Sequence, residues 1–427
     1  MRRSEWLVRV NVVAILLDLC GYVISRDVLP QSEIYLPDYT VYHNYSTIKY
    51  QLKNLISNNP QFIKADWTYR SKQDRPQILL HVSNFTNTFP KLKLLFSYGE
   101  HAREFFPVET MFALLHTLLH GVMSSTDSHE HLSSRMVLSN FDLYIIVMAN
   151  PDGRHYLEKS QNYCWRGTST GVDLNRNFDW QFGNLGSSSN HEDEEYRGQN
   201  AFSEPESEIF QHVTSQHKFD AFFSFHSGIR QIYLPYADTR SKQLQLHHDN
   251  FHNLLELAKQ MSHATKYYFR YGEGYTLNDY TADGTIFDYM AGVRKIPYSY
   301  AVELWGEGDH EGARCFDLFN PRSEDLKAAV TDILPLYWTI FQYFHHIHQS
   351  SSRHGGHSVY MPTPYPMLSS DVLRFGHVLL VGVVALTCYF AVHNYLPSCL
   401  RCFPRRRIIS LRNLSSTFTS FSSMKTT

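Results

Sequence analysis

The stretch that decides the fold is 91–104, KLKLLFSYGEHARE, in which an apolar run leads directly into a group of imidazole and charged side chains. Three further runs have the same apolar character: FDLYIIVMAN (141–150), FDAFFSFH (219–226) and YSYAVEL (298–304). Short apolar runs rich in aromatic and β-branched residues are typical of buried strands. The four runs therefore predict the strands of one central β-sheet.

Helical patterns separate these strand-like runs. Ser203 and Glu206 form a capping box, which predicts that a helix begins here and covers 205–216. Other stretches with helical periodicity are 109–121, 244–261 and 323–347. Strands that alternate with helices predict an α/β fold, with a mixed central β-sheet and helices on both of its faces. In such folds functional side chains gather where strands end.

The composition limits the class of protein. Of the 427 residues, 43% are hydrophobic and 19% are charged, so a large folded core is expected. The predicted folded domain covers residues 36–350. The formal net charge is −2, and no basic patch precedes the C-terminal tail. No nucleic-acid partner is therefore expected.

Both ends of the chain carry segments typical of a membrane protein. Residues 1–25 combine a basic start with an apolar run, which predicts a secretory signal peptide; an uncleaved anchor is the alternative. Residues 375–396 are apolar and long enough for one transmembrane helix across the lipid bilayer, and arginines follow them directly. Residues 351–374 then form a stalk and 397–427 a cytoplasmic tail. This pattern predicts a single-pass type I protein of the plasma membrane or secretory pathway, with its body extracellular or lumenal.

Two further features agree with that location. Asn44-Tyr-Ser and Asn84-Phe-Thr are N-glycosylation sequons. Of the six cysteines, only Cys164 and Cys315 lie in the predicted body. Two cysteines in an oxidising compartment could form one disulfide, although their spacing alone does not establish it.

The first candidate functional residues follow the strand-like run 91–98. His101 and Glu104 are three residues apart, so they meet on one side of a helical turn. Imidazole and carboxylate are both good Zn²⁺ ligands, but this spacing is common by chance. A catalytic zinc site needs a third protein ligand, and His226 at the end of a strand-like run is the candidate. A lone histidine there is more often structural, so the two motifs are informative only together.

Other polar residues also fall near predicted strand ends. Arg166, Asn175 and Arg176 suit a carboxylate clamp, because a guanidinium matches a carboxylate bidentately. A surface salt-bridge cluster is the alternative for these three. Glu303 lies in the predicted strand 298–304, where a carboxylate is costly to bury without a positive partner. A zinc-bound water would be such a partner, and a buried salt bridge is the alternative.

Eight motifs follow one another along the body of the chain. They are HAREFFPVE, MANPDGRHY, CWRG, GVDLNRNFDWQFG, YRGQNAFSEPESE, FFSFHSG, DYTADGTIFDYM and YAVELWG. Their order resembles that of the zinc metallocarboxypeptidases of the carboxypeptidase A type, over about Tyr42 to Tyr343. The resemblance implies the zinc carboxypeptidase fold, one Zn²⁺ per chain, and peptide or protein C-termini as substrates.

The resemblance also implies a role for each matching residue. The zinc ligands would be His101, Glu104 and His226. The catalytic residues would be Glu303, as general base and then acid, and Arg166, which would stabilise the oxyanion. The residues that bind the substrate would be Arg103, Asn175, Arg176 and Tyr280. A disulfide between Cys164 and Cys315 is implied as well.

The choice of C-terminal residue depends on the floor of the specificity pocket. The resemblance puts Phe287 at that position, with Ile286 beside it, which favours neutral apolar C-terminal residues. Asp279 and Asp283 lie nearby, and either one turned inward would favour Lys or Arg instead.

Two other functions fit parts of the pattern. A catalytically silent binding ectodomain would be expected to lack a ligand or the catalytic glutamate, and all of these are present. An intracellular peptidase that trims glutamate from protein tails would not need the signal, the sequons or the apolar span. The sequence therefore favours a membrane-anchored carboxypeptidase.

Overall fold

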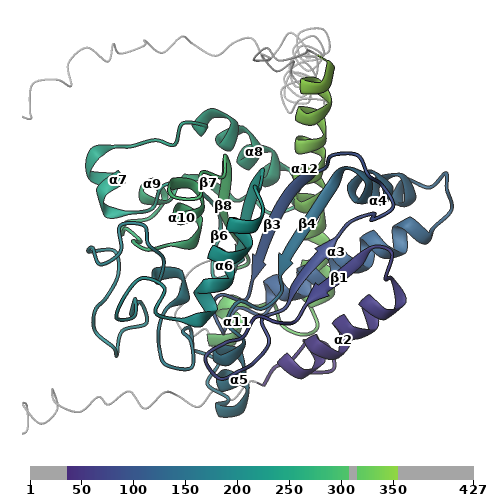
Figure 1. The fold of residues 1–427 in the computed structure, drawn as a ribbon. Helices are drawn as coiled ribbons and strands as arrows, with labels where there is room; N and C mark the ends of the chain where they lie inside the picture. Colours follow the sequence, from purple (N-terminus) through teal and green to yellow (C-terminus); the bar gives the residue numbers. More distant parts are fainter. Residues whose placement is uncertain (1–35, 307–314, 354–427) are drawn as a thin grey trace, which may run out of the picture. The chain divides into compact units, whose positions relative to one another are not determined.

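The four predicted strands lie side by side at the centre of one sheet (Figure 1). β3 (Leu92–Tyr98) pairs with β4 (Phe141–Ile146) on one side and with β5 (Ala221–His226) on the other. β5 in turn pairs with β8 (Tyr298–Leu304), and all three pairings are parallel. Parallel neighbours end at the same edge of a sheet, so the carboxyl ends of these four strands lie together.

The computed structural model describes residues 36–306 and 315–353. The predicted signal peptide, transmembrane helix and cytoplasmic tail lie outside these residues, as does most of the predicted stalk. Within these ranges, no helix combines the length and the apolar composition needed to cross a bilayer.

Four shorter strands, which the sequence patterns did not predict, complete the sheet. They are β1 (Ile63–Asp66), β2 (Leu79–Val82), β6 (Arg230–Leu234) and β7 (Arg270–Glu273). Within the described residues the sheet has eight strands in the order β1-β2-β4-β3-β5-β8-β6-β7. The β1–β2, β2–β4 and β6–β8 pairings are antiparallel, so the predicted mixed sheet is confirmed. Strands of four or five residues are too short to show a pattern of their own.

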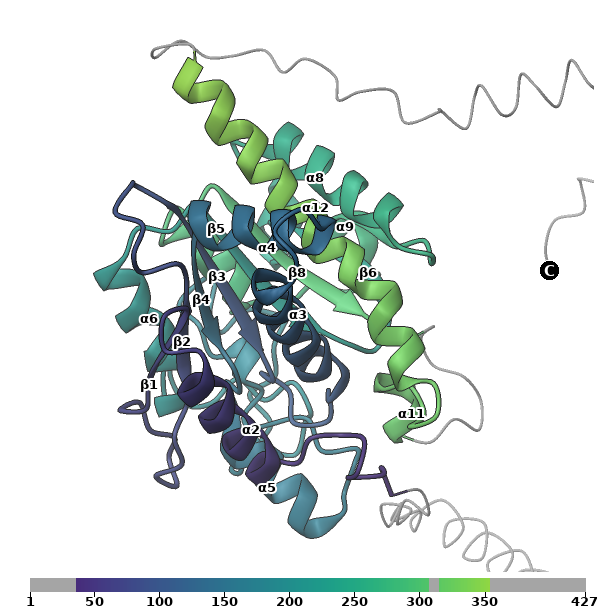
Figure 2. The ribbon, with the colours of Figure 1, turned by 90° about the vertical axis from the view of Figure 1, so that its right-hand side faces the viewer.

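Helices cover both faces of the sheet, as predicted. Successive strand residues point to opposite faces, so Leu94 and Phe96 of β3 belong to one core cluster and Leu95 to the other. The first cluster includes residues of α2 (Tyr45–Asn58), α3 (Phe106–Met123) and α12 (Leu326–Arg353), which Figure 2 shows over that face. The second includes residues of α6 (Pro205–Gln216) and α10 (Ile286–Gly292). The remaining helices are α4 (His129–Asn140), α5 (Pro151–Ser160), the 3₁₀ turn η1 (Leu174–Arg176), α7 (Thr239–Leu244), α8 (Phe251–Ala264), α9 (Gly274–Leu277) and α11 (Cys315–Phe319).

Two helix predictions were wrong in part. The predicted helix 244–261 is interrupted, because Gln245 adopts a left-handed conformation with φ +50° and ends α7. The predicted capping box does not form, although the helix covers the expected residues. The N-cap is Glu204, and Pro205 takes the first helical position. The Ser203 hydroxyl instead accepts a hydrogen bond from the Asn177 amide, which removes it from the helix end.

Candidate active site

The turn after β3 and the end of β5 bring three metal-binding side chains together. His101 and Glu104 lie between β3 and α3, and His226 is the last residue of β5. Their ligand atoms all lie within 4.8 Å of one another, and all three residues are buried. His101 Nδ1 lies 2.6 Å from Glu104 Oε1, and His226 Nδ1 lies 3.0 Å from Glu104 Oε2. The three predicted ligands therefore converge on one point.

The geometry of these donors fits a zinc ion. The two histidine Nδ1 atoms face each other at 3.1 Å, beside the Glu104 carboxylate. The outer nitrogens contact other carboxylates: His101 Nε2 lies 3.2 Å from Asp173 Oδ1, and His226 Nε2 lies 2.7 Å from Glu100 Oε2. Such outer carboxylates orient a ligand imidazole and leave its inner nitrogen available to a metal. Two imidazoles and one carboxylate are an established set of protein ligands for catalytic zinc.

Glu303 lies beside this cluster because of the strand register. It pairs with His226 across the parallel strands β5 and β8. Its Oε2 is buried and has no hydrogen-bond partner among the described residues. Burial, together with the nearby Glu104 carboxylate, raises the pKa of Glu303 to about 8. This carboxyl group is therefore suited to exchange a proton near neutral pH.

Asp173 connects the metal-binding cluster to the arginines. It is fully buried, and it accepts a hydrogen bond from Arg166 Nε at 2.9 Å. Arg176 Nη1 lies 3.8 Å from the same carboxylate. Burial alone would raise the pKa of Asp173, but Arg166, His101 and Arg176 hold it well below its usual range. Asp173 is thus a fixed negative charge that orients cationic groups around the cleft.

The predicted clamp residues Asn175 and Arg176 lie in η1. Asn175 Oδ1 accepts a hydrogen bond from the Ile286 amide at 2.8 Å, which directs its carbonyl oxygen to α10 and leaves its NH₂ group as a donor. Arg176 donates from Nε to the Gly186 carbonyl and from Nη2 to Glu195 Oε1, at 3.1 and 2.8 Å. Both side chains are therefore held rigidly, and one Arg176 donor is engaged by an acidic side chain.

A pocket of about 100 Å³ joins these groups. Its lining includes eight of the predicted residues: His101, Arg166, Asn175, Arg176, His226, Tyr280, Phe287 and Glu303. The rest of the lining consists of Gly274, three alanines, Tyr233, Asn278 and Thr285. Neither of the two aspartates that would have reversed the predicted preference lines this pocket. Asp279 is exposed, and the buried Asp283 accepts hydrogen bonds from Gly186 and Thr239.

The zinc carboxypeptidase family model matches residues 48–334, which is most of the described body. The chain belongs to the zinc carboxypeptidase family. Its members are zinc enzymes, and the buried cluster of His101, Glu104 and His226 is a donor set that suits that metal.

Individual relatives agree with this family assignment. The chain is 29% identical over 285 residues to zinc carboxypeptidase A 1 of Anopheles gambiae, covering 64% of this chain and 62% of that protein. It is 25% identical over 328 residues to human carboxypeptidase O, covering 73% and 83%. The fold is similar to the crystal structure of carboxypeptidase A from Helicoverpa armigera, with a TM-score of 0.62 at 22% identity, covering 72% and 75%.

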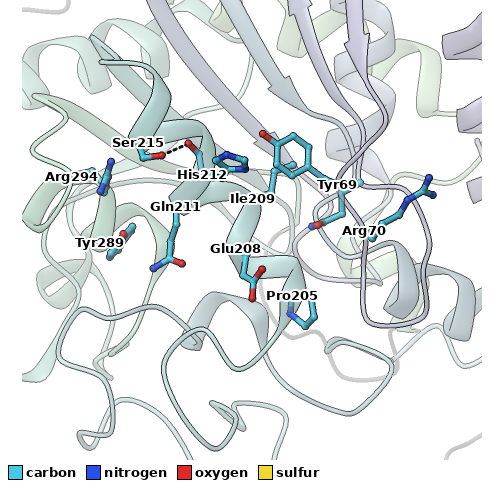
Figure 3. Close-up of a pocket in the computed structure, with 11 residues that line it drawn as sticks. Tyr69, Arg70, Pro205, Glu208, Ile209, Gln211, His212, Ser215, Tyr289 and Arg294 are labelled. Carbon is cyan, nitrogen blue, oxygen red and sulfur yellow. Dashed lines mark hydrogen bonds between the residues drawn. The ribbon is translucent and has the colours of Figure 1, made fainter.

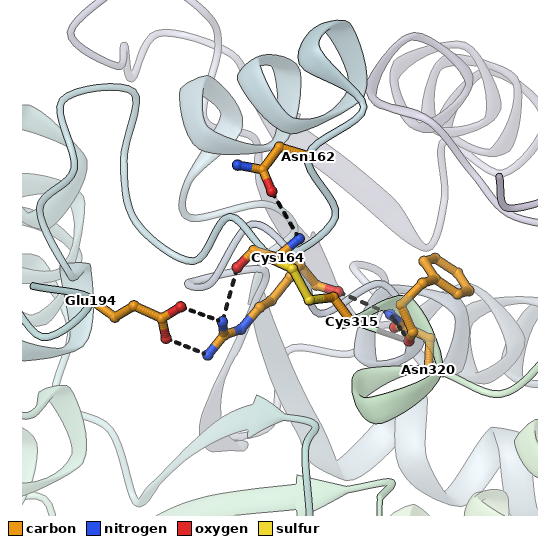
Figure 4. Close-up of a disulfide and its surroundings, with 7 residues drawn as sticks. Asn162, Cys164, Glu194, Cys315 and Asn320 are labelled. Atoms are coloured by element: carbon orange, nitrogen blue, oxygen red, sulfur yellow. Dashed lines mark hydrogen bonds and ion pairs between the residues drawn. A yellow bond between two sulfur atoms is a disulfide. The ribbon is translucent and has the colours of Figure 1, made fainter. Parts of the chain in front are cut away.

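Arg103 contacts one end of the disulfide that Figure 4 shows. Cys164 and Cys315 are joined, with Cα atoms 5.1 Å apart. Arg103 donates to the Cys164 carbonyl at 2.9 Å and forms an ion pair with Glu194 at 3.1 Å. It does not line the pocket described above. Arg103, the predicted secondary substrate contact, therefore lies outside the central pocket, next to the disulfide that joins two segments far apart in the sequence.

A second pocket, of about 450 Å³, lies beside α6 (Figure 3). Its lining includes Tyr69, Arg70, His212 and Arg294. None of the predicted site residues lines it. In the part of the chain that the structure describes, the one group of three metal-binding side chains is the cluster at β3 and β5. The metal-binding cluster therefore lies at the first pocket and not at this one.

The sequence patterns missed four acidic residues of the site. Glu100 directly precedes the motif HAREFFPVE and Asp173 lies inside GVDLNRNFDWQFG, but neither motif shows that these residues contact the outer histidine nitrogens. Glu194 and Glu195 lie in an acidic run, HEDEE, that looks like a solvated loop. Their contacts with Arg103 and Arg176 depend on how that loop folds back, which no local pattern indicates.

Proposed function

We propose that the protein is a zinc-dependent exopeptidase that hydrolyses the last peptide bond of peptides or proteins. The observation that carries this proposal is the unpartnered Glu303 oxygen beside the cluster of His101, Glu104 and His226. The pKa of this carboxyl group is raised to about 8. Burying such a group lowers the stability of the fold, and a shifted pKa beside a metal-binding cluster is typical of a group that transfers protons.

Each catalytic group has a distinct task in the proposed reaction. Zinc, when bound, polarises the scissile carbonyl and lowers the pKa of water. Glu303 accepts a proton from the attacking water at Oε2 and passes it to the leaving amine. Arg166, which Asp173 holds by Nε, stabilises the negative charge on the carbonyl oxygen with its terminal nitrogens.

The proposed clamp explains exopeptidase action. The Asn175 NH₂ group and the Arg176 guanidinium are donors suited to a free carboxylate, and Tyr280, with an exposed fraction of 58%, can close over it. Arg103 would contact the substrate further from its C-terminus. A substrate with an amidated C-terminus would leave buried donors unpaired, which costs binding energy.

We propose a preference for neutral apolar C-terminal residues. Phe287 and the alanines that line the pocket support this preference. It is supported further because Asp279 is exposed and the buried Asp283 is hydrogen-bonded to Thr239, and neither lines the pocket. Release rates from peptides that end in Phe, Leu, Lys, Arg or Glu test it. Faster release of Lys or Arg would contradict it.

The function itself is tested with a matched pair of variants of the full-length chain. Glu303→Gln should lower kcat about 10²- to 10⁴-fold, because it removes the proton-transfer group, and should retain one zinc per chain. Glu208→Gln, an exposed change on α6, should leave kcat unchanged. Turnover of Glu303→Gln equal to that of wild type would refute the proposed mechanism.

Membrane anchoring is proposed from the sequence alone. The apolar span 375–396 and the arginines after it support a type I orientation, with the body extracellular or lumenal. In sealed microsomes, external protease should leave the body intact and remove only the tail. Digestion of the body under these conditions would contradict the orientation.

A further inference from the structure

Glu100 is a buried carboxylate that none of the proposed catalytic steps uses. It directly follows β3 and Gly99 and precedes His101 in the chain. Its exposed fraction is 1%, and its Oε1 has no hydrogen-bond partner among the described residues. A carboxylate at this depth is costly unless a positive or strongly donating group lies beside it. The groups that contact Glu100 therefore indicate which role this carboxylate has.

The group beside Glu100 is the outer nitrogen, Nε2, of His226, the third predicted metal ligand. Glu100 Oε2 lies 2.7 Å from His226 Nε2 and accepts a hydrogen bond from the Ser224 hydroxyl at 2.7 Å. Ser224 lies two residues before His226 on β5 and pairs in register with Ser97 of β3. The pairing of β3 with β5 therefore fixes the Glu100 carboxylate against His226.

This contact determines which nitrogen of His226 can bind a metal. A carboxylate at Nε2 favours the tautomer with hydrogen on Nε2, so the lone pair of Nδ1 points to Glu104 and His101. Asp173 contacts Nε2 of His101 in the same way. The two ligand histidines thus each have a carboxylate of their own on the side away from the metal position.

We propose that Glu100 is a positioning residue, which orients His226 and strengthens zinc binding by its charge. This inference rests on the zinc site proposed above. Contacts of this kind change metal affinity by about 10- to 100-fold when they are removed. Glu100 acts through His226 and does not touch the substrate.

The test compares zinc affinities of the purified full-length chain, measured by competition with a chelator of known affinity. Glu100→Gln keeps the size and an oxygen acceptor but loses the charge, and zinc binding should weaken about 10- to 100-fold. Glu100→Leu also loses the acceptor and should weaken it at least as much. If the Leu variant does not fold, the Gln variant decides the question.

Glu206→Gln is the matched control, because Glu206 is equally buried, lies on α6 and does not line the catalytic pocket. Its zinc affinity should equal that of wild type. The visible absorption spectrum of Co²⁺-loaded protein should change in the Glu100 variants and not in the control, since it reports the ligand geometry directly.

Wild-type zinc affinity in Glu100→Gln, or an equal loss in the Glu206→Gln control, would overturn the proposal. Failure of the proposed function looks different. A wild-type chain that binds zinc tightly but releases no C-terminal residue would refute the exopeptidase activity and leave the assignment of Glu100 intact.

Discussion

Asp173→Asn is the substitution for which the structure gives the clearest expected cost. Asn has the same shape, but it has one carbonyl oxygen in place of two carboxylate oxygens. It can therefore keep only one of the two hydrogen bonds that Asp173 accepts, at Oδ1 from the Asn175 amide and at Oδ2 from Arg166 Nε, both at 2.9 Å. The negative charge is lost, however, beside two guanidinium groups that it neutralises, Arg166 and Arg176. The two guanidinium side chains are only 16% and 5% exposed, so water cannot replace the carboxylate fully.

Removing one partner of a buried ion pair costs about 3–5 kcal/mol. Because Asn keeps one of these hydrogen bonds but loses the charge, we expect at least the lower end, about 3 kcal/mol of unfolding free energy. For a urea m-value near 3 kcal/mol/M, the unfolding midpoint should fall by about 1 M. The pKa of Asp173 is lower in the folded chain than its ordinary value of 3.8. This stabilisation is therefore fully present above that value and is lost as the pH falls below it.

The assay is urea unfolding at neutral pH, followed by tryptophan fluorescence, on the zinc-free chain so that metal loss does not contribute. Glu194→Gln is the control, since it breaks an ion pair whose carboxylate is 62% exposed. It should change the unfolding free energy by less than about 1 kcal/mol. Equal midpoints for Asp173→Asn and wild type would refute the claim that Asp173 holds the arginines.

Three further predictions follow from other groups. Glu195→Gln should lower KM and leave kcat unchanged, because Glu195 contacts Arg176 at 2.8 Å and competes with the substrate carboxylate; an unchanged KM would count against this competition. Burial raises the pKa of Glu206 to about 7, so its folded-state proton makes wild-type stability fall as the pH rises from 4.5 to about 7. The Tm of Glu206→Gln should not show this fall between these pH values. A variant whose Tm depends on pH as that of wild type does would contradict the prediction. Removing zinc with a chelator should abolish turnover and lower the Tm, and stoichiometric zinc should restore both; activity that survives full metal removal would exclude a zinc enzyme.

The central fold was predictable because four strands are long and apolar enough to be recognised singly. His101 and His226 each follow or end one of these runs, and the resemblance to the zinc carboxypeptidases implied that both bind one zinc ion. The short outer strands β1, β2, β6 and β7 were not predictable, because four or five residues carry no clear alternation. The break after α7 depends on one residue, Gln245, in a conformation that its sequence does not indicate.

The motifs contain the three residues of the metal-binding cluster and Glu303, but they do not indicate which residues contact them. Glu100 precedes His101 by one residue, yet its contact is with His226, 126 positions later in the chain. That contact exists only because β3 and β5 are parallel neighbours in one particular register. Residues that bind a metal recur at fixed spacings, whereas residues that orient them depend on which strands pair, and a single sequence does not state the pairing.

The opposite pKa shifts of Asp173 and Glu303 separate the two roles that buried carboxylates play here. Asp173 is surrounded by fixed cations, so its pKa is held low and it stays ionised throughout the physiological range. Glu303 has an oxygen without a partner and lies near Glu104, so burial raises its pKa to about 8. A divalent cation in the cluster would lower the pKa of Glu303 from this value, because it opposes the repulsion from Glu104. A bound metal would therefore favour the ionised carboxylate, which is the form that accepts a proton.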